Sequence, residues 1–439
     1  MHFDPRGCPV STGSADAIAH VEQALWRMLT YFGNPLDDLD AAIAAAPGWA
    51  LPYVLKANCL LSGAEHGYAL QAAALLDRAA EAAARSPTPQ RERDHIVASR
   101  ACAAGHLRQA CDLWERILVE HPRDVAALLA AHLFDFYRGD SRNLNRRVAR
   151  VLPAWSADLP LYSQVLGLHA FGLEECNHYD QARDTALQAL SIDPRDPWAI
   201  HAVAHVHEMR GEHDLGAQWL QSRTADWAPD NGFAFHNWWH LALFHLERMD
   251  LDAALALFDE RIALDPQMAL QNVDITALLW RLQLLGVDVG GRWQAAAALW
   301  PRQQPDAGFY PFNDFHAAMA FIGAGQAAQA RQLLQAVQAR AADGDDPARM
   351  AAGIGVPLIG ALLDYAEGRY DAATDGLLRV REHASGFGGS HAQRDVIELT
   401  LLDASARAGQ RQLARHLLNE RLHAKAGTPL TAHWQARVS

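Results

Sequence analysis

The amino-acid sequence predicts an all-α fold, a right-handed α-solenoid built from consecutive helix pairs. The first observation behind this prediction is a spacing of 34 residues between turn-forming residues, found from Gly105 to Gly139, from Asn177 to Gly211 and from Gly291 to Gly325. The second is that alanine and leucine, which favour helices, dominate the chain. The third is that patterns typical of strands are nearly absent.

Each helix pair carries the same local signals. The stretches "CAAGHLRQACDLWERILVEHP", "CNHYDQARDTALQALSIDP" and "RMDLDAALALFDERIALDP" share a turn residue, an alanine five positions later and a closing proline. Gly or Asn at the turn accepts the positive φ that ends the first helix, and proline stops the second. The small alanine lets the two helices approach closely. The 34-residue spacing is the tetratricopeptide period, and about ten such pairs are expected.

The repeats are expected to form a single array over residues 1–439. Residues 15–90 contain degenerate N-terminal repeats, 91–385 the central repeats and 386–439 a C-terminal capping repeat. We expect the superhelix to curl into a closed or nearly closed form with an inner pocket.

Composition narrows the classes of partner and the compartment. The chain has 439 residues, half of them hydrophobic, and a formal net charge of -13 without a Lys/Arg-rich run. Nucleic acid and anionic membranes are therefore not expected partners, because both require a basic surface. The five cysteines form no C-x-x-C pair, and neither a signal peptide nor an apolar run of membrane-spanning length is evident. We predict a cytoplasmic protein, and the sequence does not indicate its oligomeric state.

The densest cluster of functional groups is "HAVAHVHEMRGEH", residues 201–213. With a turn at Gly211, His207 joins an apolar stripe and is expected in the core. His201, His205 and Glu208 form a second stripe at spacings i, i+4 and i+7, predicted to face the concave groove. A solvated helix face is one alternative for this stripe. Coordination of a divalent metal or a shared proton are the others.

The following repeats place further polar and aromatic groups on the same inner side. His240 lies to one side of His236 and Trp239 and is expected either in the core or in the groove. Asp274 is expected to form an ion pair with Arg281 or to bind a charged ligand together with it. Three functional groups, His391, Arg394 and Asp395, gather where another helix begins. The candidate ligand-binding residues are His201, His205, His236, Trp239, Asp274, Arg281, His316, His391, Arg394 and Asp395.

Four separated motifs in order, "SIDPRDPWAIHAVAHVHEMRGEHDLGAQWL", "FHNWWHLALFHLE", "DITALLWRLQLLG" and "GFGGSHAQRDVIELTLLDA", resemble the tetratricopeptide repeat protein 38 family. The resemblance extends over nearly the whole chain, since "STGSADAIAHVEQAL" also fits the opening of that family. It implies a helical-repeat fold and a soluble, cytoplasmic protein. It implies no particular activity.

These observations favour a ligand-binding protein that holds a small molecule or a short peptide in a groove lined by His, Trp and Arg. The alternative is a hydrolase or lyase in which His201 and His205 act as general base and acid or as ligands to a divalent metal, while Glu208 orients one of them. A protein–protein scaffold is the second alternative. No nucleotide or redox cofactor is predicted, because neither a Gly-rich fingerprint nor a Walker motif is present. Cys176 and Ser390 are candidate nucleophiles without an assignable partner.

Overall fold

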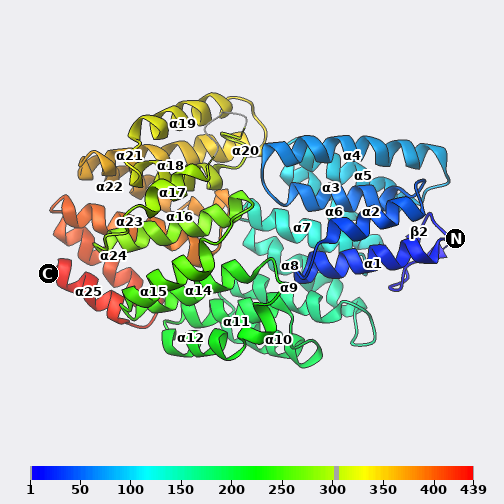
Figure 1. Ribbon diagram of the computed structural model, residues 1–439, viewed down its shortest axis with the longest axis horizontal. Helices are drawn as coiled ribbons and strands as arrows, with labels where there is room; N and C mark the ends of the chain where they lie inside the picture. Colours follow the sequence, from blue (N-terminus) through cyan, green and yellow to red (C-terminus); the bar gives the residue numbers. More distant parts are fainter. Residues whose placement is uncertain (1, 301–305, 439) are drawn as a thin grey trace. The chain divides into compact units, whose positions relative to one another are not determined.

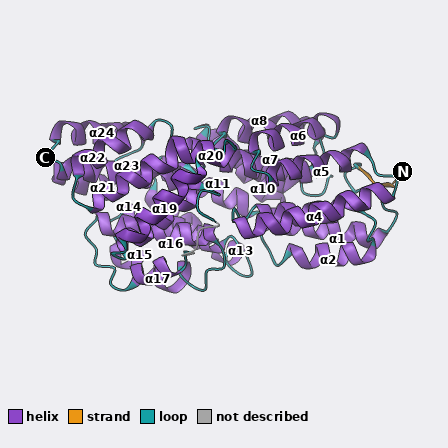
Figure 2. Cartoon of the chain, turned by 90° about the horizontal axis from the view of Figure 1, so that it is seen from above, coloured by secondary structure: helices purple, strands orange, loops and turns teal. Residues whose placement is uncertain are grey.

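The computed structural model describes residues 2–300 and 306–438, and their regular secondary structure is almost entirely helical (Figures 1 and 2). A short antiparallel hairpin, β1 (His2–Phe3) and β2 (Pro9–Val10), precedes the helices. The first helices are α1 (Ala15–Thr30), α2 (Pro35–Ala45), α3 (Ala50–Leu61), α4 (His66–Arg85), α5 (Gln90–Ala103), α6 (Leu107–Glu120), α7 (Val125–Tyr137), α8 (Ser141–Val151), α9 (Tyr162–Glu174) and α10 (Tyr179–Ile192).

The remaining helices continue the same pattern. They are α11 (Pro197–Met209), α12 (His213–Ser222), α13 (Thr224–Trp227), α14 (Ala234–Glu247), α15 (Leu251–Leu257), α16 (Ala269–Leu284), α17 (Arg292–Ala298), α18 (Pro311–Gly323), α19 (Ala327–Arg340), α20 (Asp346–Met350), α21 (Val356–Ala366), α22 (Tyr370–Arg381), α23 (His391–Arg407), α24 (Arg411–Ala424) and α25 (Pro429–Val438). Single 3-10 turns follow α8 (Leu152–Ala154) and α22 (Ala384–Phe387), and π-helical turns lie at Phe258–Ile262 and Ala351–Gly355.

Consecutive helices pack as pairs. The most extensive helix–helix packing joins α1 to α2, α3 to α4, α5 to α6, α9 to α10 and α21 to α22. The first helices of neighbouring pairs are also in contact, as α14 and α16 are. This is the pattern of a helical-repeat scaffold, in which each unit contacts its neighbours along the chain. The prediction of an all-α solenoid is confirmed.

The alanines predicted to allow close helix approach are fully buried. Ala110, Ala182 and Ala254 each have 0% of their surface exposed. Gly216 makes the same point in α12, since a Cβ built there would lie 2.2 Å from the ring of Phe244 on α14. Small residues in the second helix of each pair therefore set the spacing between helices.

From α5 onward, the turn inside each helix pair has one conformation. After α11, for example, the Gly211 N–H donates to the Glu208 carbonyl and the Glu212 N–H donates to the His207 carbonyl, the two bonds of a Schellman turn. The residues with positive φ at these turns include Gly105, Gly139, Asn177, Gly211, Met249, Gly286, Gly325, Gly368 and Gly409.

One predicted turn was placed wrongly. Gly291 has a φ of -71° and lies just before α17, whereas Gly286, with a φ of 82°, closes the turn after α16. The 34-residue spacing between Gly291 and Gly325 was therefore a coincidence, because three glycines lie within six residues here.

The chain divides into two compact units. The first contains Met1–Val203 and Ala225–Phe233, and the second contains Ala204–Thr224 and Ala234–Ser439. Helix α11 begins in the first unit and ends in the second. The boundaries predicted at 90/91 and 385/386 stay predictions.

One helical segment, Asp346–Ala366, is long and apolar enough to cross a membrane by length and composition. Its most apolar window is 61% buried, and a buried core helix of a soluble protein passes the same test. Proline near the start of α20 fits the first turn of a helix, where no N–H partner is lost.

Candidate metal centre

The predicted stripe on α11 is buried. His201, His205 and Glu208 are 2%, 0% and 6% exposed, so the alternative of a solvated helix face is wrong. The ring of His201 lies against Phe171 and Phe233, with centroids 5.3 and 5.0 Å away. His205 follows one turn later on the same face of the helix.

Helix α14 supplies two further histidines to the second unit. His236 and His240 are one turn apart and 7% and 0% exposed. Trp239 lies between them in sequence, is fully buried, and stacks on the His236 ring at 5.3 Å and 11°. This stacking fixes the plane of the His236 imidazole.

Two carboxylates hold the outer nitrogens of these histidines. The Nδ1 of His236 lies 2.7 Å from the Oδ2 of Asp274 on α16. The Nδ1 of His240 lies 3.0 Å from the Oε2 of Glu208 on α11. The predicted role of Glu208, orienting a histidine of its own helix, is wrong, because its partner is His240 of the next repeat.

The inner nitrogens of the same two rings face each other. The Nε2 atoms of His236 and His240 are 3.2 Å apart. The His205 ring is 4.5 Å from that of His240, and one nitrogen from each of His205, His236 and His240 lies within 4.8 Å of the others. Tetrahedral ligands at the usual Zn–N distance are about 3.3–3.4 Å apart. The separation of the His236 and His240 nitrogens therefore suits two ligands of one metal ion, and His205 lies beside them as a third imidazole.

Two arrangements satisfy the pair of facing nitrogens. If both Nδ1–H groups donate to the carboxylates, two Nε2 lone pairs meet, and a cation between them removes the repulsion. Burial raises the pKa of Glu208 to about 7, while Lys425 and His205 lower it. A protonated Glu208 instead donates to His240 Nδ1, and His240 Nε2–H then donates to His236 Nε2. This hydrogen-bonded chain, Asp274–His236–His240–Glu208, can thus serve either as part of a metal site or as a proton relay.

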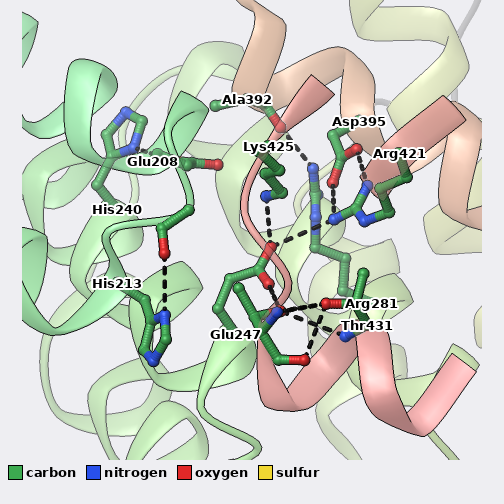
Figure 3. Close-up of polar contacts among 12 residues, drawn as sticks. Glu208, His213, His240, Glu247, Arg281, Ala392, Asp395, Arg421, Lys425 and Thr431 are labelled. Carbon is green, nitrogen blue, oxygen red and sulfur yellow. Dashed lines mark hydrogen bonds and ion pairs between the residues drawn. The ribbon is translucent and has the colours of Figure 1, made fainter. Parts of the chain in front are cut away.

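A narrow cleft runs beside this cluster within the second unit. It is lined by Glu208, Glu247, Arg281 and Asp395 together with leucines and Trp434, and holds about 20 Å³ of space for water-sized molecules, roughly one water. In Figure 3, Glu208 is drawn between His240 and the side chains of Lys425 and Arg281. An organic ligand does not fit inside the cleft as it stands.

The charges around this cleft are paired with one another. Arg421 contacts both oxygens of Asp395 and lies 3.2 Å from Glu247, and Lys425 lies 2.6 Å from the same Glu247 oxygen (Figure 3). Burial favours the neutral acid, but Arg421 and Lys425 hold the pKa of Asp395 well below its usual range. Glu247, Arg421 and Lys425 could not be predicted from the sequence, because no repeat position distinguishes them from surface charges.

The other candidate residues lie apart from the histidines or act structurally. Arg281 forms no ion pair with Asp274 among the described residues, and donates instead to the carbonyls of Ala392 and Gln393. His316 is fully buried, its Nδ1–H donates to the Phe312 carbonyl at 2.8 Å, and burial lowers its pKa to about 3.

Of the three groups predicted at the start of α23, two stay together and the third faces another helix. Arg394 contacts His391 and the Gly389 carbonyl, whereas Asp395 faces Arg421. Ser390 caps the helix by accepting the Gln393 N–H at 3.2 Å, so its hydroxyl has a structural role. Cys176 contacts the Ser141 carbonyl at 3.2 Å, and burial raises the pKa of its thiol, which disfavours a nucleophilic role.

His207 and His245 have a role at the turns. The predicted core position of His207 is wrong, because its side chain is 15% exposed and its Nδ1 contacts Glu212 across the turn at 2.7 Å. His245 makes the equivalent contact with Asp250 at 3.2 Å. The two histidines therefore occupy equivalent turn positions in their helix pairs.

No protein-family model matches the chain. The chain is similar to a chain of the APC/C hetero-tetramer Cut9–Hcn1, with 12% identity over 99% of this chain and 78% of that one, at a TM-score of 0.45. It is also similar to human IFIT1, solved as a dimer with m7Gppp-AAAA, with 13% identity over 98% and 95% of the two chains and a TM-score of 0.42. The TPR domain of P58(IPK) follows at 15% identity, 91% and 99% coverage and a TM-score of 0.21.

Proposed function

We propose that this helical-repeat protein binds one divalent transition-metal ion through His205, His236 and His240. The observation that carries the proposal is the 3.2 Å approach of two Nε2 atoms whose Nδ1 atoms both rest on carboxylates. Metal-bound histidines typically make this outer contact, which fixes the tautomer and raises the basicity of the inner nitrogen.

The donor set favours Zn²⁺, Cu²⁺ or Ni²⁺ over harder ions. Imidazole nitrogens suit these metals, whereas Mg²⁺ and Ca²⁺ prefer oxygen ligands. Glu208 and Asp274 belong to the outer shell, since each contacts a histidine nitrogen that faces away from the metal position. Their negative charges also offset part of the charge of the buried ion.

Hydrolytic catalysis is the second candidate function. Three histidines are the protein ligands of some catalytic zinc sites, in which a water is the fourth ligand. A metal lowers the pKa of such a water toward neutrality and so supplies hydroxide. We favour metal binding without catalysis, because the adjacent cleft has room for only a water-sized molecule and not for a substrate.

Metal titration of chelator-treated protein tests the proposal. We expect one Zn²⁺ per chain by isothermal titration calorimetry, with the stoichiometry checked by elemental analysis. His236→Ala and His240→Ala each remove a ligand and should weaken Zn²⁺ binding by more than the roughly 10–100-fold expected when Asp274→Asn weakens an outer contact.

His245→Ala is the matched control, because His245 lies on the same helix as His240, also contacts an aspartate, and lies outside the cluster. Its Zn²⁺ affinity should equal that of the unaltered protein, and circular dichroism should show all four variants folded. Equal Zn²⁺ affinity in folded His240→Ala, or less than stoichiometric metal in the unaltered protein, would refute the proposal.

A further inference from the structure

The first unit contains a groove that plays no part in the proposed metal site. It lies between α1 and the start of α9, is open to solvent and has a volume of about 560 Å³. Pockets that bind small molecules commonly have about 300–1,000 Å³. The polar and aromatic side chains of its walls are Glu22, Gln23 and Trp26 of α1, Tyr162 and Gln164 of α9, and Asp193 directly after α10.

The α1 wall of this groove is anchored to a distant segment of the same unit. Phe32, just after α1, forms an isolated antiparallel bridge with Asn231, whose side-chain amide also donates to the Thr30 carbonyl at 2.9 Å. The ring of Trp26 stacks on that of Phe32, with centroids 5.9 Å apart and an interplanar angle of 15°. The indole therefore has a fixed orientation in the groove wall before any ligand binds.

Asp193 brings a negative charge to the opposite wall without a cation paired to it. Its oxygens accept the Gln164 side-chain amide at 2.9 Å and the Arg195 backbone N–H at 3.0 Å, and both donors are neutral. The Arg195 guanidinium lies over the Phe32 ring instead, 4.1 Å from its centroid. Among the described residues, no cationic side chain lies within 4.0 Å of the Asp193 carboxylate. A carboxylate has about four lone-pair sites, so Asp193 can accept further hydrogen bonds.

Glu22, the second carboxylate of the groove, is paired. Arg6 donates to both of its oxygens, at 2.5 and 2.7 Å, and also to Asp4 at 3.1 Å. Two carboxylates thus share one guanidinium, and this group of three side chains has a net charge of about -1 at neutral pH. Both walls of the groove therefore favour a cation over an anion.

The remaining surface of the groove is aromatic and aliphatic. Trp26 and Tyr162 are half-buried, and Leu159, Pro160 and Ile192 line the space beside them. The face of an aromatic ring attracts a cation, most strongly for tryptophan. An aromatic wall next to an unpaired carboxylate thus suits a ligand that combines a positive charge with an apolar body.

We propose that this groove of the first unit binds a small primary amine with an aromatic body. The ammonium group donates to Asp193, and the aromatic body packs against Trp26 and Tyr162. The negative charge of both walls repels a carboxylic acid of the same size. The site goes beyond the proposed metal binding and does not depend on it, since the three histidines of the metal site belong to the second unit.

Calorimetric titration of chelator-treated protein with 2-phenylethylamine, 2-phenylethanol and 3-phenylpropionate at pH 7 tests the site. These probes share the aromatic body and differ in charge. We expect one amine per chain, bound at least fivefold more tightly than the alcohol, and the acid should bind most weakly. Added NaCl should weaken binding of the amine but not of the alcohol, because salt screens the charges. Omitting the metal separates this result from the outcome of the metal titration.

Two variants locate the binding. Asp193→Asn keeps the size of the side chain but removes its charge, so the amine should bind no more tightly than the alcohol. Ala19→Trp fills the groove from α1 and should weaken binding of both probes at least tenfold. Asp184→Asn is the matched control, because Asp184 is an exposed aspartate of α10 outside the groove, and it should leave amine affinity unchanged.

Circular dichroism should show all three variants folded. The proposal would be overturned by an alcohol that binds the unaltered protein as tightly as the amine, or by no binding of the amine. Unaltered amine affinity in folded Asp193→Asn or in folded Ala19→Trp would overturn it as well.

Discussion

At the scale of single residues, Asp196 shows how burial and hydrogen bonding select a protonation state. It is fully buried just before α11, and its Oδ1 accepts the Ala199 N–H at 3.1 Å. Its Oδ2 lies 2.9 Å from the Ser163 hydroxyl, which also lies 3.0 Å from the Ala189 carbonyl. The Ser163 hydroxyl has one proton, which it can donate either to the Ala189 carbonyl or to Asp196, but not to both. If Asp196 is protonated and donates to the Ser163 oxygen, the hydroxyl is free to donate to Ala189 and all three contacts are satisfied.

Burial raises the pKa of Asp196 to about 7, against the pull of the Ala199 and Ser163 contacts. The folded state thus holds a proton that the unfolded chain loses near pH 4, and the contribution to stability is complete below pH 4 and is lost as pH rises toward 7. Asp196→Asn imitates the protonated acid. We expect it to raise the free energy of unfolding at pH 8 by about 1–3 kcal/mol.

Urea denaturation from pH 4 to pH 8 checks this prediction. The difference between Asp196→Asn and the unaltered protein should grow with pH across that window, while the exposed Asp184→Asn should show no such trend. A variant that is equally destabilised at every pH would show that Asp196 is needed as a carboxylate.

At the scale of elements, the repeated turn explains which part of the fold the sequence predicts. The Schellman turn needs one residue with positive φ, and glycine marks that position in most pairs. Helix type, pairing and burial of the alanines could therefore be predicted. Where several glycines lie close together, as at Gly286, Gly290 and Gly291, spacing alone did not identify the one that closes the turn.

The sequence predicts which residues of the candidate site share one helix face, but not which of them make contact between helices. Spacing placed His201, His205 and Glu208 on one face of α11, and repeat alignment selected His236 and Asp274, which the structure brings together. The contact of Glu208 with His240, and the absence of an Asp274–Arg281 pair, depend on how α14 and α16 are rotated against their neighbours. The repeat period does not encode that rotation.

Met249 offers a test of the turn. It occupies the left-handed position after α14 with a φ of 58°, where most other pairs have glycine. Left-handed backbone costs a non-glycine residue about 1–2 kcal/mol, partly offset by the extra freedom of glycine in the unfolded chain. We expect Met249→Gly to raise the melting temperature by about 1–4 °C.

Met249→Ala is the control, since alanine lacks the long side chain but retains the backbone strain. Differential scanning calorimetry should place it at or below the unaltered protein. A melting temperature for Met249→Gly that is no higher than that of Met249→Ala would show that backbone strain at this turn is negligible.

At the scale of the whole molecule, contacts in a solenoid are made between neighbours along the chain, so a ligand stabilises the region around its site. The histidines of the proposed metal site come from the end of α11 and from α14, with Asp274 on α16, all within the second unit. The first unit contributes none of these three histidines.

Hydrogen–deuterium exchange with mass spectrometry should therefore show a regional effect of Zn²⁺. We expect slower exchange in peptides covering α14 and α16 and no change in peptides covering α1 to α6. His240→Ala should abolish the protection. Equal protection along the whole chain would contradict a local site and favour non-specific binding of the ion.

The stacking of Trp239 on His236 has a consequence for light emission. An indole stacked on an imidazole, with centroids 5.3 Å apart and no exposed surface, lies close to any ion that this imidazole binds. A paramagnetic ion such as Cu²⁺ quenches an excited indole at that range, whereas Zn²⁺, with a filled d shell, does not. The protein thus carries a built-in fluorophore whose brightness would depend on the electronic configuration of the ion beside it.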